Sequence, residues 1–61
     1  MKDWIGKNVK LVFKSDDQIS YYTAKVLDVG IVFITFRDKF GNKISKKIGD
    51  IELIKEEKEV E

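Results

Sequence analysis

Basic residues are spread through the β-rich part of this sequence, and aromatic residues lie among them. Lysine and arginine neutralise phosphates, and aromatic rings stack on unpaired bases, so the combination predicts a surface that binds single-stranded nucleic acid. The residues that we expect to carry it are Lys10, Lys14, Tyr21, Lys25, Arg37, Lys39, Phe40, Lys43 and Lys47. The alternative is a solvated sheet face whose lysines discourage edge pairing, with the aromatic rings in the core.

Strand geometry limits how many of these side chains can share one face, because successive residues of a strand point to opposite sides of the sheet. Lys46 and Lys47 are adjacent, so only one of them can belong to a single flat patch. If Tyr22 points inward, then Tyr21 points outward and is the stacking residue of the pair.

An enzymatic interpretation has little support in the residue types. The chain has no His and no Cys, so it lacks the commonest proton carrier at neutral pH and a thiolate nucleophile. Asp16 and Asp17 fall among turn-forming residues, where carboxylates bond to nearby backbone amides, and we expect this rather than a metal site. The four glycines are isolated, unlike those of a phosphate-binding loop. We expect no catalysis, metal, cofactor or small-molecule substrate.

Alternation of apolar and polar residues predicts the elements that position the basic and aromatic side chains. We expect strands at residues 9–14, 19–29, 31–36, 43–48 and 51–55. Phe40 lies near the tip of an expected hairpin loop at 38–42, and Gly49 and Asp50 predict a short 3₁₀ turn. The predicted fold is all-β: a small, five-stranded, strongly bent barrel of residues 1–55 with an acidic flexible tail at 56–61.

The third expected strand, residues 31–36, has apolar residues on both faces. Val32, Ile34 and Phe36 can face the core, whereas Ile31 and Phe33 need another cover. A sharply bent barrel could cover them internally, or a neighbouring subunit could do so. In the second case Ile31 and Phe33 form an oligomer interface.

The order of the strands resembles that of small SH3-like barrels, of which Sm-like proteins are one branch. Three segments carry the resemblance: Gly6-Lys7-x-Val9-x-Leu11, Tyr22-x-Ala24-x-Val26 and the run at 48–54. The resemblance implies a ring-forming, RNA-binding class of fold. The uridine-binding residues of that family are missing, because residues 29–32 hold no Asn and Ile48 precedes Gly49 where the family has Arg.

Size and charge add two expectations. A chain of 61 residues is a single domain that buries only about 60% of its unfolded surface, and without Cys or His it has no disulfide or His/Cys metal site to stabilise it. This favours a homo-oligomer. Residues 1–49 contain ten Lys or Arg and five Asp, whereas residues 50–61 contain two Lys and six acidic residues, which predicts a basic body with an acidic tail.

The sequence therefore predicts a non-enzymatic, oligomeric β-barrel that binds single-stranded nucleic acid, RNA rather than DNA, through a basic face. The alternative is a protein–protein interaction or adaptor module with no nucleic-acid ligand, in which a strand edge and an apolar patch engage the partner. No apolar run approaches the roughly 20 residues that span a bilayer, and the chain has neither cysteine nor an apolar leader. We expect a cytoplasmic protein without a membrane partner.

Overall fold

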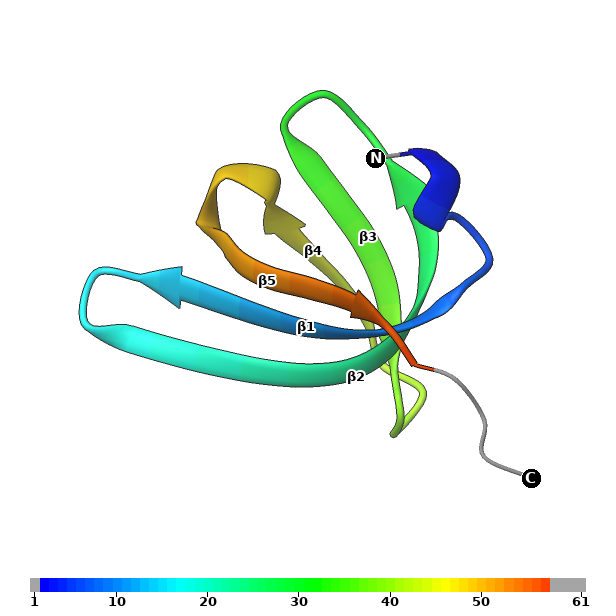
Figure 1. The fold of residues 1–61 in the computed structure, drawn as a ribbon, viewed down its shortest axis with the longest axis horizontal. Helices are drawn as coiled ribbons and strands as arrows, with labels where there is room; N and C mark the ends of the chain where they lie inside the picture. Colours follow the sequence, from blue (N-terminus) through cyan, green and yellow to red (C-terminus); the bar gives the residue numbers. More distant parts are fainter. Residues whose placement is uncertain (1, 58–61) are drawn as a thin grey trace.

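The computed structural model describes residues 2–57, which form one five-stranded antiparallel sheet (Figure 1). The strands lie in the order β4-β3-β2-β1-β5. Their bounds are Asn8–Ser15 (β1), Gln18–Val29 (β2), Phe33–Asp38 (β3), Lys43–Lys47 (β4) and Ile51–Glu56 (β5). Two 3₁₀ turns, Lys2–Trp4 (η1) and Ile48–Asp50 (η2), complete the elements. The all-β prediction is confirmed, as are five strands and the 3₁₀ turn before the last one.

The core lies on the concave face of the sheet and follows the alternation that the sequence predicts. Its buried residues are Val9, Leu11, Phe13, Ala24, Val26, Val29, Ile34 and Phe36. Phe13 stacks on Phe36 with ring centroids 5.7 Å apart, and Tyr22 meets both rings at 5.8 and 5.0 Å. This aromatic cluster joins β1, β2 and β3, because each strand contributes one ring.

Strand β2 is long and pairs with two neighbouring strands along different parts of its length. Its first half pairs with β1, and its second half pairs with β3 through a bulge between Val26 and Asp28. The extra residue, Leu27, changes the alternation, so that Val26 and Val29 both face the core. Figure 1 shows the β1–β2 hairpin extending to one side, while β3 and β4 cross behind β5.

The prediction of a barrel is wrong in one respect: the sheet is bent, but it is not closed. Strand β4 pairs with β3 and strand β5 pairs with β1, and no ladder joins β4 to β5. The three-residue η2 connects these two edges, and its Ile48 packs against the core together with Ile51. The connection between the two edge strands therefore contributes apolar packing to the core, while the edges themselves stay unpaired with each other.

The third strand begins at Phe33, two residues later than predicted. The N–H of Gly30 donates to the carbonyl oxygen of Phe33 at 2.8 Å, which places Ile31 and Val32 at the tip of a tight turn. Val32 is consequently 53% exposed and is not a core residue. Ile31 is 99% exposed and Phe33 is 50% exposed, so the bend of the sheet does not cover them.

The N-terminal turn covers one open end of the core. Trp4 is half-buried and packs against the core, whereas Ile5 is largely exposed. Backbone bonds fix this turn: Gly6 N–H donates to Val26 C=O at 2.8 Å, and Val26 N–H donates to Lys7 C=O at 3.0 Å. Among residues 2–57 there is no helix with the length and apolar character needed to cross a bilayer.

Candidate nucleic-acid interface

The convex side of the sheet, here called the outer face, carries most of the residues that the sequence analysis selected. Alternation in each strand places them there, opposite the buried positions. The selected outer-face residues are Lys10, Lys14, Tyr21, Lys25, Arg37, Lys43 and Lys47. Lys39 and Phe40 lie in the β3–β4 loop. Lys46 pairs with the buried Ile34, so its side chain belongs to the opposite face from Lys47.

Three cations lie directly opposite one another on neighbouring strands. Lys25 of β2 faces Arg37 of β3, and Arg37 faces Lys43 of β4. Asn8 of β1 continues this line on the other side of Lys25, and we call these four residues the corner row. Directly opposed side chains have Cβ atoms about 4.5–5.5 Å apart, and like charges at that spacing destabilise a sheet. The corner row therefore concentrates positive charge at a cost to stability.

A second pair of like charges lies on the adjacent line of the sheet. Lys10 of β1 faces Lys55 of β5 on one side and Thr23 of β2 on the other. Lys55 and Asn8 were missed by the sequence analysis. The alternation of Ile54 with Lys55 could have placed Lys55 on the outer face, but its position opposite Lys10 depends on the β1–β5 pairing.

These cations have no close carboxylate partner within residues 2–57. The single ion pair found there joins Lys7 Nζ to Glu56 Oε1 at 3.7 Å, and neither residue belongs to the corner row. Both side chains are about half exposed, so this pair adds little stability. The charge of the opposed cations is therefore not neutralised by a close ion pair in this part of the chain.

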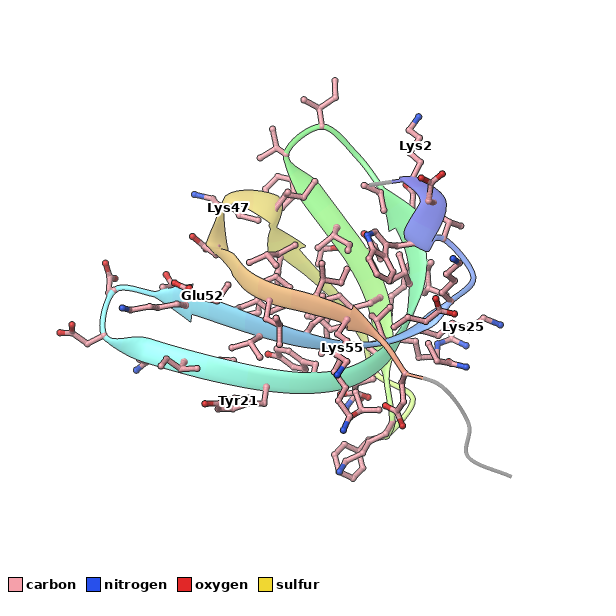
Figure 2. The ribbon with its side chains drawn as sticks, viewed as in Figure 1. Lys2, Tyr21, Lys25, Lys47, Glu52 and Lys55 are labelled. Carbon is pink, nitrogen blue, oxygen red and sulfur yellow. The ribbon has the colours of Figure 1, made fainter. Side chains whose placement is uncertain are left out.

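Two open hollows lie beside the opposed cations. The first has a volume of about 440 Å³, and its charged walls are Lys25, Arg37, Asp38, Lys39 and Glu57. The second has a volume of about 450 Å³ and is lined by Lys10, Lys55, Glu56 and Glu57. Figure 2 shows Lys25 and Lys55 near the end of β5 at which that strand stops, with Glu52 near its beginning. Each hollow therefore places two or more cations beside two carboxylates.

The β3–β4 loop is held by one carboxylate. Asp38 Oδ1 accepts hydrogen bonds from the backbone N–H groups of Phe40 at 2.9 Å and Asn42 at 2.8 Å. The Asn42 side-chain amide donates to Asp38 Oδ2 at 3.4 Å. These bonds, above all that from Asn42 N–H, lower the pKa of Asp38 below its ordinary value, although partial desolvation opposes them. The ionised carboxylate thereby fixes the loop that presents Phe40.

Two aromatic rings are available for stacking. Phe40 is 78% exposed, with Lys39 Nζ 5.3 Å from its ring centroid. Tyr21 is 75% exposed and faces Val12, which in turn faces Leu53. The line Tyr21–Val12–Leu53 lies next to the line that contains Lys10 and Lys55. A line of apolar and aromatic residues therefore borders the basic residues on the outer face. Figure 2 labels Tyr21 of this line and Lys55 of the neighbouring one.

Not all of the selected cations gather at the corner row. Lys14 faces Ile19 near the β1–β2 turn, beyond the Tyr21 line. Lys47 faces Phe33 at the far end of β4. Both lie on the outer face, but the hollows are lined by Lys10, Lys25, Arg37, Lys39 and Lys55. The interface is therefore centred where β5 ends and β2 bends.

Comparison of the chain with protein-family models, with curated proteins and with solved structures finds no match. The comparisons therefore give no support to the resemblance to Sm-like proteins, and the structure shows only the coarser feature, a small all-β fold of five antiparallel strands. Among residues 2–57, no three His, Cys, Asp or Glu side chains gather into a group that could hold a metal ion. The arrangement of cations and aromatic rings is the chemistry that the described part of the chain offers.

Proposed function

We propose that this protein binds single-stranded nucleic acid on the outer face of its sheet. The observation that carries the proposal is the direct opposition of Lys25, Arg37 and Lys43 across three neighbouring strands. Sequences that fold well avoid such conflicts between local charge and the pairing of strands. Phosphates bound among the three cations would attract all of them and offset the repulsion between them. Binding of phosphates would therefore account for this arrangement of charges.

The exposed rings favour an unpaired strand over a duplex. A duplex presents its phosphates but keeps its bases stacked inside, whereas an unpaired strand can place a base on Tyr21 or Phe40. Each such stack contributes about 1–3 kcal/mol. The layout that resembles Sm-like proteins makes RNA the first choice of ligand and DNA the second. The proposal includes a cytoplasmic location, and the absence of cysteine agrees with a reducing compartment.

The decisive experiment is a titration of fluorescently labelled single-stranded oligouridylate at two salt concentrations. The logarithm of affinity falls by about 0.7 per phosphate contact for each tenfold rise in salt. With three to five contacts, going from 50 to 200 mM salt should weaken binding about 20-fold to 130-fold. A duplex of the same length should bind more weakly than the single strand. Absence of binding at 50 mM salt would overturn the proposal.

A second candidate function is assembly through the apolar turn between β2 and β3. Ile31, Val32 and Phe33 are exposed together at its tip, although β-branched residues are unusual in tight turns. We propose that a second copy of the chain covers this tip in a homo-oligomer. The alternative is an adaptor that offers the same tip to a different protein and has no nucleic-acid ligand. Oligouridylate binding by a strictly monomeric protein would argue against both assembly and the adaptor alternative.

A further inference from the structure

Glu57 is the residue that the two hollows have in common. It lies beside cations in each hollow. It shares the first with Lys25, Arg37 and Lys39, and the second with Lys10 and Lys55. Its backbone N–H donates to the carbonyl oxygen of Asn8 at 2.9 Å, which fixes its position directly after β5. The backbone of an acidic residue is therefore anchored beside two groups of cations.

The other carboxylates of the hollows are already engaged. Asp38 accepts three hydrogen bonds within its own loop, and Glu56 pairs with Lys7. Glu57 forms no ion pair within 4.0 Å among residues 2–57, and neither do the cations that surround it. Its charge consequently acts on the cations of the hollows through space, and salt screens this interaction over roughly 8 Å at physiological ionic strength.

We infer that the carboxylate of Glu57 competes with phosphate groups for the cations of the two hollows. This competition limits the affinity of the hollows for a phosphate chain. The inference rests on the proposed function and deepens it. A phosphate chain that occupies both hollows comes close to Glu57, because that residue lines both of them. Its negative charge repels the incoming phosphates and lowers the positive potential of both groups of cations. The site thus binds weakly and reversibly even though its cations are concentrated.

The test compares Glu57→Gln with Glu52→Gln in the full chain. Both substitutions remove one negative charge near an end of β5, and Glu57→Gln keeps the backbone N–H that donates to Asn8. Glu52 is exposed near the beginning of β5 and lines neither hollow (Figure 2). The probes are labelled oligouridylate and inorganic polyphosphate, which has phosphates but no bases. Thermal unfolding of each variant verifies that the fold is retained.

Glu57→Gln should tighten binding of both probes about two- to fivefold at low salt, as expected for one exposed charge, and Glu52→Gln should change it less than that. Equal effects of the two substitutions would overturn the inference, because they would reflect net charge alone. Weaker binding by Glu57→Gln would also overturn it, since the carboxylate would then assist the ligand. If the unaltered protein and both variants fail to bind either probe, the proposed function itself is wrong.

Discussion

Tyr21 and Tyr22 are neighbours in β2 that lie on opposite faces of the sheet. Tyr22 packs between Phe13 and Phe36 in the aromatic cluster of the core. Tyr21 stands on the outer face opposite Val12, with three-quarters of its surface exposed. Two identical side chains thus occupy contrasting environments one residue apart. Substitution of Tyr22 tests the contribution of a ring to stability, and substitution of Tyr21 tests its contribution to binding.

Replacing Tyr21 with Leu should weaken oligouridylate binding and leave stability unchanged. One base stack contributes about 1–3 kcal/mol, so the loss in affinity should be about five- to hundredfold. Binding of inorganic polyphosphate, which cannot stack, should be unaffected. The matched variant Tyr22→Leu should lower the free energy of unfolding by about 1–2 kcal/mol, because it removes two aromatic contacts from the core. Equal oligouridylate affinity of Tyr21→Leu and the unaltered protein would contradict the stacking role.

The opposed cations lead to a second prediction: one substitution should raise the free energy of unfolding and weaken nucleic-acid binding. Arg37→Gln removes the central charge of the line Lys25–Arg37–Lys43 and relieves two repulsions. The free energy of unfolding should rise by about 0.2–1 kcal/mol. At the same time oligouridylate should bind more weakly, with a salt dependence reduced by about one phosphate contact. Chemical denaturation and fluorescence titration measure the two effects.

The control for this experiment is Lys14→Gln, which removes the same charge from the same face. Lys14 lies opposite Ile19 and not opposite another cation, so its removal should leave the free energy of unfolding unchanged. If Arg37→Gln were instead less stable than the unaltered protein, the cost that we assign to the opposed cations would be refuted.

Local pattern in the sequence is enough to predict most of the fold. The alternation of Tyr22, Ala24 and Val26 identifies a strand and its buried face, and it also puts Tyr21 and Lys25 outside. The turn after β1 spans two residues, Asp16 and Asp17, so the pairing of β1 with β2 follows from sequence neighbours. Such features need only short-range information.

The missed features depend on long-range register or on turns that oppose local preference. Lys55 faces Lys10 because β5 pairs with β1, and no pattern near either residue specifies that pairing. Ile31 and Val32 have high strand propensity, yet they occupy a turn tip because Gly30 bonds to Phe33. The absence of closure has the same origin, since it depends on where β4 and β5 end relative to one another.

The Asp38 loop predicts a dependence on pH. Because the folded state holds the pKa of Asp38 below its ordinary value, the ionised carboxylate stabilises the loop fully above the unfolded pKa of about 4. That stabilisation should be lost as the pH falls through the lowered folded pKa. The backbone amide signals of Phe40 and Asn42, followed by NMR during acid titration, should report this transition.

Asp38→Asn is the control for the acid titration. Its side-chain oxygen can still accept hydrogen bonds from the two amides but does not titrate, so the transition at Phe40 and Asn42 should disappear. A transition that persists in this variant would assign the pH dependence to another carboxylate.

The apolar turn gives the last prediction, which concerns assembly. Ile31 is almost fully exposed, so Ile31→Ser removes nothing from the core and should not lower the stability of the monomer. If a second copy covers the turn, the substitution removes apolar area from the interface and should shift the protein from oligomer to monomer. Size exclusion with light scattering at tens of micromolar protein measures this shift. The control, Leu53→Ser, alters a residue that is 51% exposed on β5, away from the turn, and should leave the oligomer intact. An unaltered protein that is already monomeric under these conditions would refute the assembly and leave the turn available to a different partner.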